Sequence, residues 1–204
     1  MALARVPVPV GAAIVLTLVT SLATPAAAET AVYSLDPGTS AVDFTVYATK
    51  IFKFKRDGAF KAFTGQLSFD PDNLLKTQID LTVYTSSVDI HDAEHNQLLK
   101  SEGFFDVQRF PTMHFVSAHA EAKPDGTFAW TGDLTIRGIT HRVTIPLTLK
   151  RQRDSSPGAN LESTFEIDRT EFGIDGIKQT GGFNVSISKK VRIHISMATH
   201  SSHQ

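Results

Sequence analysis

The chain has 204 residues, with 20 Lys and Arg against 21 Asp and Glu, and a net charge of −1. One domain, or at most two small ones, fits this length, and 41% hydrophobic residues with 14 Phe can bury a core, which excludes a disordered chain. The near-neutral charge argues against a general polyanion binder, so we expect no nucleic-acid partner. The sequence contains no Cys, which excludes thiol nucleophiles, thiolate metal sites and disulfide scaffolds.

The first residues have the features of an export signal. No charge occurs between Arg5 and Glu29, and the span between them is rich in Ala, Leu, Val and Thr. Small residues, Ala26–Ala28, stand directly before Glu29, where a signal peptidase would cleave. Two prolines near the start of the apolar stretch argue against an uncleaved membrane span. We therefore expect a cleaved signal peptide over residues 1–28, a single mature domain over 29–204 and a periplasmic location.

The rest of the chain shows the pattern of β-strands. Apolar and polar residues alternate with a period of two, which is typical of half-buried strands. The alternation covers residues 41–48, 60–69, 77–83, 113–118, 128–136, 143–149, 163–167 and 185–197, with a short edge over 33–35. Clusters of Pro, Gly, Asp and Asn separate the runs as turns. About eight strands at hairpin spacing predict an all-β fold, an antiparallel sandwich or barrel.

One stretch departs from the strand pattern. Residues 92–100 consist of helix formers, with Asp92 or His91 near the start and Gly103 beyond the end, which predicts one short helix. Phe104 and Phe105 follow at once. We expect them to pack this helical insert against the sheet.

The same stretch contains the one motif that indicates an enzyme. His91-Asp92-Ala93-Glu94-His95 matches H-x-x-E-H, in which two His bind zinc and Glu94 activates a water. The helix is short, however, and no third ligand is obvious. Nucleophile elbows, P-loops and dinucleotide fingerprints are absent from the sequence. We expect no enzyme, no catalytic residue and no metal site, and keep a zinc-dependent hydrolase using His91, Glu94 and His95 as the alternative.

Residues 50–61 form a locally basic segment. Five positive charges and Asp57 are interleaved there with Phe52, Phe54 and Phe60. Basic and aromatic residues together can meet an anionic headgroup or a membrane surface. The interpretation we favour is a solvated loop between two strands, with the Phe side chains folded inward.

The inward faces of the predicted strands carry only apolar side chains, which offer no chemistry. An eight-stranded barrel is either filled by side chains or holds one ligand, and the period of the pattern does not decide between the two. A hollow barrel would suit a long apolar molecule. The residues expected to line it are Phe44, Val46, Phe63, Phe69, Ile79, Leu81, Leu98, Phe105, Met113, Phe115, Trp130, Leu134, Ile136, Ile145, Phe172 and Ile193.

Several blocks resemble the YceI-like family of lipocalin-like, exported polyisoprenoid-binding proteins. The blocks are Tyr33–Pro37, Ser86–Asp89, Leu98–Asp106, Gly132–Thr140 and Asp168–Ile174. The most distinctive of them is Leu98–Asp106. The resemblance extends from Tyr33 to Met197.

The resemblance implies an extended antiparallel eight-stranded lipocalin-like barrel with a short helical insert, closing around an amphiphilic lipid. The ligand would be a polyprenyl chain or an isoprenoid quinone, held without covalent bonds and without a further cofactor, for transport, storage or sequestration. Arg137, Arg169 or the basic segment would meet its headgroup. The resemblance is compatible with transient contact with a membrane surface and with a homodimer. The alternatives within non-catalytic proteins are another hydrophobic small molecule, such as a fatty amide, and a filled barrel that serves as an interaction module.

Overall fold

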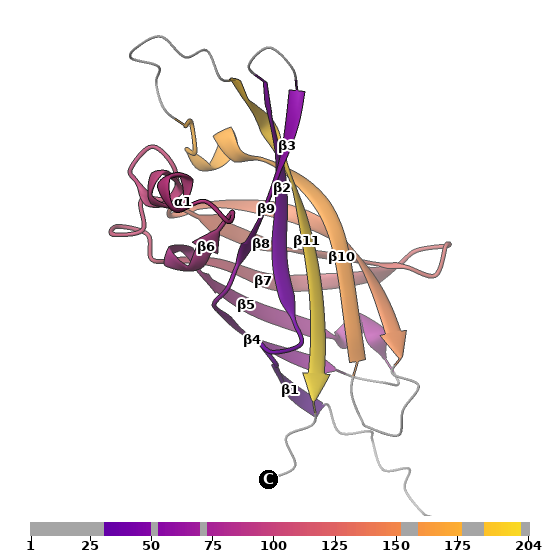
Figure 1. Cartoon of the computed structure of the whole chain (residues 1–204). Helices are drawn as coiled ribbons and strands as arrows, with labels where there is room; N and C mark the ends of the chain where they lie inside the picture. The colour runs from indigo at the N-terminus through magenta and orange to yellow at the C-terminus, as the bar shows by residue number, and fades with distance from the viewer. Residues whose placement is uncertain (1–30, 50–52, 70–72, 152–158, 177–185, 201–204) are drawn as a thin grey trace, which may run out of the picture.

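The computed structural model describes residues 31–49, 53–69, 73–151, 159–176 and 186–200 (Figure 1). The predicted signal peptide and residues 50–52 of the basic segment lie outside these ranges. Within them, no helix has both the length and the apolar character that crossing a bilayer requires.

Eleven strands form one antiparallel sheet that closes on itself. They are β1 (Ala31–Leu35), β2 (Ala41–Thr49), β3 (Lys53–Phe60), β4 (Phe63–Phe69), β5 (Gln78–Tyr84), β6 (Val88–Asp89), β7 (Thr112–Ala122), β8 (Phe128–Ile136), β9 (Ile139–Arg151), β10 (Ala159–Asp168) and β11 (Ser186–His200). Their order is β1-β4-β5-β7-β8-β9-β10-β11-β2-β3-β6. Because β1 also pairs with β11, Ser34 opposite His200 and Leu35 opposite Thr199, the sheet becomes a barrel (Figure 1). The predicted antiparallel barrel is confirmed.

The strand count is higher than predicted because three strand positions are each broken in two. β1 and β2 are separated by a turn at Asp36–Ser40, β3 and β4 by Lys61 and Ala62, and β5 and β6 by the 3-10 helix η2 (Thr85–Ser87). β1 and β2 pair with the same strand, β11, and β4 and β3 follow them as neighbours. Counting each broken strand once leaves eight positions around the barrel.

The loop predicted for the basic segment is wrong over its described part. Residues 53–60 form β3, which pairs with β2 from Val42 opposite Phe60 to Thr49 opposite Lys53. The predicted strand over 60–69 accordingly begins at Phe63, and Phe60 ends the preceding strand. The alternation was hidden because Arg56 and Gly58 stand at positions where a half-buried strand normally has apolar side chains.

The predicted helix is confirmed. Helix α1 spans Ala93–Lys100, and the Asp92 side chain caps it by accepting a hydrogen bond from the His95 backbone N–H at 3.1 Å. The chain then folds back, because the Phe105 N–H donates to the Leu99 carbonyl at 3.0 Å. Figure 1 shows α1 toward the end of the barrel that is remote from β1.

The other end of the barrel is filled. Buried side chains of neighbouring strands belong to one core cluster there, and each is 6% exposed or less: Leu35, Leu67, Ile79, Ala120, Trp130, Leu147, Leu161 and Met197. The register pairs Leu67 with Ile79, Ala120 with Trp130 and Leu161 with Met197. These contacts form a closed core beneath the site described below.

We expect Leu67→Ala to lower the free energy of unfolding by about 2–5 kcal/mol, because Leu67 is fully buried and the filled end cannot collapse into the space left. Urea unfolding with an unchanged slope measures the loss. The matched control is Val32→Ala, nearby on the paired strand β1 and 57% exposed, which should change stability by less than about 0.5 kcal/mol. Equal losses in the two variants would contradict a filled core at this end.

Candidate functional site

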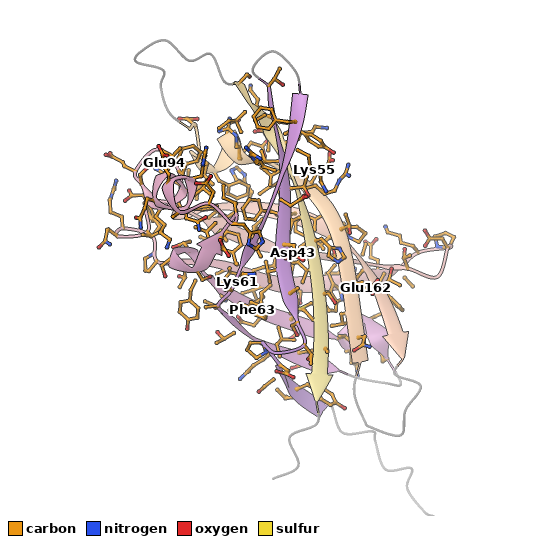
Figure 2. All side chains as sticks on the ribbon, viewed as in Figure 1. Asp43, Lys55, Lys61, Phe63, Glu94 and Glu162 are labelled. Atoms are coloured by element: carbon orange, nitrogen blue, oxygen red, sulfur yellow. The ribbon has the colours of Figure 1, made fainter. Side chains whose placement is uncertain are left out.

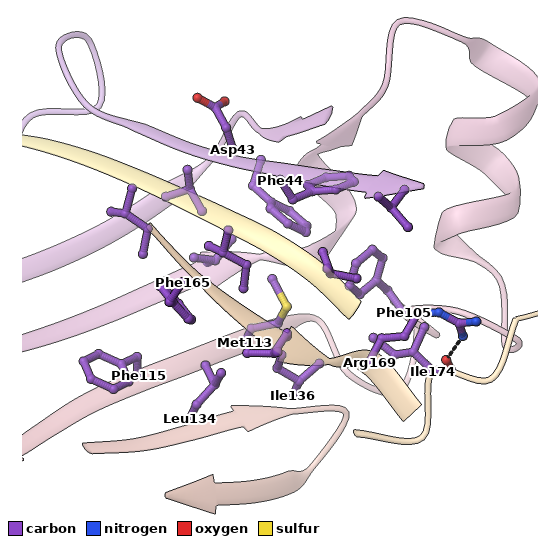
Figure 3. A pocket seen from close by; sticks show the side chains of 18 of the residues that line it. Asp43, Phe44, Phe105, Met113, Phe115, Leu134, Ile136, Phe165, Arg169 and Ile174 are labelled. Atoms are coloured by element: carbon purple, nitrogen blue, oxygen red, sulfur yellow. Dashed lines mark hydrogen bonds between the residues drawn. The ribbon is translucent and has the colours of Figure 1, made fainter. Parts of the chain in front are cut away.

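The half of the barrel nearer α1 encloses a cavity of about 160 Å³ (Figure 3). The interior is therefore not completely filled by side chains. Strands β2, β5, β7, β8, β10 and β11 supply most of the wall, and the segment after α1 supplies part of it. The lining residues are Val42, Asp43, Phe44, Val46, Phe60, Leu81, Val83, Leu99, Phe104, Phe105, Met113, His114, Phe115, Leu134, Ile136, Ile145, Phe165, Ile167, Arg169, Ile174, Ile187, Val191, Ile193 and Ile195.

Two of the three polar residues in this wall direct their polar atoms elsewhere. The carboxylate of Asp43 points away from the cavity in Figure 3. The His114 Nε2 contacts the Asp80 Oδ1 at 2.7 Å, and both side chains are largely exposed. The wall around a bound molecule is therefore apolar except at Arg169.

Arg169 is buried, and its guanidinium donates hydrogen bonds to backbone carbonyls. It stands in the 3-10 helix η3 (Arg169–Phe172). Its Nε donates to the Ser188 carbonyl at 3.0 Å and its Nη2 to the Ile187 carbonyl at 3.1 Å, while Nη1 donates to the Ile174 carbonyl (Figure 3). Burial lowers the pKa of Arg169 from its ordinary value, and the nearby charges of Asp168 and Asp175 act in the opposite direction. These bonds fasten η3 to β11.

Aromatic contacts join the β2–β3 hairpin to the segment after α1. The Phe44 and Phe60 rings lie 5.5 Å apart, and the Phe60 and Phe105 rings meet edge to face at 5.4 Å. Gly58 makes room for this arrangement, since a Cβ there would come within 2.4 Å of the Phe44 ring. The Phe side chains thus form one side of the cavity rather than filling it.

The structure brings most of the sequence-predicted residues into the cavity wall. These are Phe44, Val46, Leu81, Phe105, Met113, Phe115, Leu134, Ile136, Ile145, Ile193 and Arg169. All but Phe105 and Arg169 lie in strands. The alternating pattern identified the inner face correctly at these positions.

Other predicted residues lie outside the wall. Phe63, Ile79, Trp130 and Phe172 are buried in the core, and Leu98 packs against it. Ile79 and Trp130 belong to the filled end, which the period of the pattern does not distinguish from the hollow one. Phe69 ends β4, and its side chain is outside the described part of the chain.

Arg137, which the sequence analysis assigned to the headgroup, does not line the cavity. Arg137 occupies the tight turn between β8 and β9, with φ of 52°. Its guanidinium donates to the Glu102 carbonyl at 2.7 Å and to the Phe104 carbonyl, and it lies over the Phe110 ring at 5.7 Å. Arg137 therefore anchors the segment that follows α1, because its guanidinium donates to the backbone of that segment.

The sequence analysis missed about half of the wall. Val42, Val83, Val191 and Ile195 share alternating faces with predicted residues, so the pattern itself could have included them. Other strand residues missed are Asp43, Phe60, His114, Phe165, Ile167 and Ile187. Leu99, Phe104 and Ile174 lie outside the strands, where no period marks the inner side.

The H-x-x-E-H motif does not have the geometry of a zinc site. His91 precedes the helix and has a left-handed φ of 60°, so His91 and His95 do not share a helix face. The His95 Nδ1 pairs with Asp92 at 3.0 Å, and the His91 Nδ1 lies 3.7 Å from Asp89. Among the described residues, no three His, Asp or Glu side chains gather closely enough to hold a metal ion.

We expect Arg169→Lys to lower the free energy of unfolding by about 1.5–3 kcal/mol, because one ammonium cannot replace a fork that satisfies three carbonyls. Urea unfolding measures this loss. Arg192→Lys is the matched control on β11, since Arg192 is exposed and its Nη2 pairs with Glu166 at 3.0 Å. A loss no larger than that of the control would show that Arg169 does not fasten η3.

Two proteins of similar sequence are relatives of this chain. A UPF0312 protein of an Enterobacter species is 36% identical over 121 residues, and Protein YceI of Salmonella arizonae is 34% identical over 120 residues. Each match covers 57% of this chain and 62% of the relative, so it spans less than two thirds of the relatives' length.

Solved structures share the fold. BcnA of Burkholderia cenocepacia aligns with a TM-score of 0.69 and 24% identity, covering 80% of this chain and 98% of that one. A polyisoprenoid binding domain from Saccharophagus degradans, implicated in plant cell wall breakdown, aligns with a TM-score of 0.67 and 14% identity, covering 84% and 99%.

The model of the YceI-like domain matches residues 33–199. This range contains every described strand except the ends of β1 and β11. The chain, with its closed antiparallel barrel, therefore belongs to the YceI-like family.

Proposed function

We propose that the protein is an exported carrier that holds one amphiphilic isoprenoid-type lipid, a polyprenyl chain or an isoprenoid quinone, in the barrel cavity. The observation that carries this proposal is the apolar wall around an enclosed space. Each Å² of apolar surface that leaves water on binding contributes roughly 25 cal/mol. An apolar tail therefore gains binding energy here without any specific polar contact.

The apolar wall favours a tail over a compact polar molecule, and the size of the cavity limits how much of the tail is covered. At roughly 10–15 Å³ for each water, the cavity has room for about ten waters, or roughly 300 Å³ of liquid. This volume is at the lower end of ligand pockets. A short run of isoprene units fits inside, and a longer chain extends through the mouth.

Relatives support the lipid class over the alternatives. The Saccharophagus degradans domain with this fold is a polyisoprenoid binding domain, which favours an isoprenoid over a fatty amide. The wall residues supply neither a nucleophile nor a metal-binding group in contact with the cavity. We therefore propose binding without catalysis, and no observation favours the zinc-dependent hydrolase.

An exported carrier would work in the aqueous space that membrane lipids have to cross between two membranes. Residues 1–28 carry the pattern of a cleaved signal. A barrel that covers the apolar tail would move such a lipid between membranes or sequester it. We propose the periplasm as its location.

We expect Leu134→Trp to abolish lipid binding while the protein stays folded, because the larger ring enters the cavity and excludes the tail. Native mass spectrometry of protein purified without detergent measures the adduct, and solvent extraction identifies the lipid. Overpacking should cost about 1–3 kcal/mol of stability.

The matched control for this variant is Val116→Trp, on the outer face of β7 and 39% exposed. The control should keep the adduct of about one lipid per chain. Clean apo mass for the wild-type protein, with no uptake of offered quinone or polyprenyl lipid, would refute the carrier.

The export proposal has its own test. We expect protein from a periplasmic extract to begin at Glu29, because the small residues before it fit signal peptidase. N-terminal sequencing measures the start. A chain that retains Met1 and stays in the cytosolic fraction would contradict export.

A further inference from the structure

Arg56 carries the one charge on the inner face of the β2–β3 hairpin, within its described side chains. It lies directly opposite Val46, which lines the cavity. Residues directly opposite each other in an antiparallel pair share a face, with their Cβ atoms about 4.5–5.5 Å apart. The other residues of this face are Val42, Phe44, Ala48, Phe54, Gly58 and Phe60. A guanidinium therefore stands on an otherwise uncharged face of the hairpin.

The position of Arg56 is at the rim of the barrel. β3 pairs with β2 along its whole length, whereas β6 covers its other side only at Ala59 and Phe60. The edge of β3 beside Arg56 thus has no strand partner among the described residues. Figure 2 shows Lys55, the next residue, near the far end of this hairpin, and Lys61 at the opposite end of β3.

The guanidinium of Arg56 also differs from those of the other described arginines in the groups that it contacts. Of the arginines whose side chains the structure describes, Arg109, Arg142 and Arg192 pair with carboxylates. Arg137 and Arg169 donate to backbone carbonyls. Arg56 is exposed, and its contact is with the Phe54 ring, 5.1 Å from the centroid. Its donors remain available for a ligand.

Among the described residues, the cavity wall itself offers a headgroup no free cationic group. The cavity wall is apolar apart from Arg169, whose Nε, Nη1 and Nη2 atoms all donate to backbone carbonyls. A polar head left inside would lose its hydration without compensation, so it has to lie at the rim. A guanidinium is suited to oxyanions because it offers paired donors as well as charge.

We propose that Arg56 binds the oxyanion headgroup of the ligand, a phosphate or a carboxylate, and makes the protein selective for anionic amphiphiles over neutral ones of the same tail. The inference rests on the proposed lipid-binding function and names the headgroup class of the same site. Lys55 does not substitute for Arg56, since it faces outward and pairs with Asp57 at 2.8 Å.

A competing explanation is that Arg56 only protects the unpaired edge of β3 against association with another strand. Inward-pointing charges on unpaired strands prevent edge-to-edge association. Either sign of charge serves that purpose, whereas only a cation binds an oxyanion. Charge reversal at Arg56 therefore separates the two explanations.

The test compares farnesyl phosphate with farnesol, which share a tail and differ in the headgroup, and repeats the comparison with farnesoic acid. Titration calorimetry at low salt should give the wild-type protein at least about tenfold tighter binding of the phosphate than of the alcohol. Arg56→Glu should remove this preference and leave farnesol binding unchanged. Arg142→Glu is the matched control, because Arg142 is exposed on the outer face of β9 and pairs with Asp133 at 2.9 Å.

Each outcome has a distinct meaning. Loss of preference in Arg56→Glu, with the control unaffected, supports the headgroup site, and the preference of the wild-type protein should shrink in 0.5 M salt. Equal preference in wild-type and Arg56→Glu protein would overturn it and leave the edge explanation. Equal binding of the phosphate and the alcohol by the wild-type protein would also overturn it, with the lipid-binding function intact. No binding of any of the three probes would refute the proposed function itself.

Discussion

The pairing of β11 with β1, β2 and β10 is the constraint on which the rest of the structure depends. β10 lies along one side of β11, while β2 and then β1 share the other side. The end of β11 thereby joins the first strand to the last and removes the free edges of the main ring. The start of β11 carries the hairpin that covers the cavity. One strand of 15 residues consequently sets both the closure of the barrel and the position of its mouth.

The division of the barrel into a filled and a hollow half follows from this closure. At the filled end, Leu67, Trp130 and Leu161 are at most 2% exposed and belong to one core cluster. Toward α1, the strand positions broken at Lys61 and η2 continue as β3 and β6. The ring contact of Phe60 with Phe105 holds the β2–β3 hairpin against the segment after α1 there. The cavity thus lies beside these anchored segments, and Gly58 makes room for the Phe44 ring on one side of it.

Two arginines near the cavity fix the backbone segments around it. Arg169 fastens η3 to β11, and Arg137 holds the segment after α1 through the Glu102 carbonyl. The family resemblance led us to expect that Arg137, Arg169 or the basic segment would meet the headgroup. The donors of the two arginines are satisfied by backbone instead. A backbone carbonyl partner leaves no pattern in the sequence, because every residue carries a carbonyl that can accept a hydrogen bond.

The sequence by itself determined the class of fold, most strands and the short helix, because periods of two and a capped run of helix formers are local properties. It also determined the apolar character of the wall at positions such as Leu134 and Ile193. Only the tertiary structure decided that Trp130 fills the barrel while Leu134 faces a cavity, although both alternate on the same strand. It alone decided that Arg56 stands on the inner face of a strand. These distinctions depend on which residues from distant parts of the chain meet at one level of the barrel, and pairing at long range is not encoded in any local pattern.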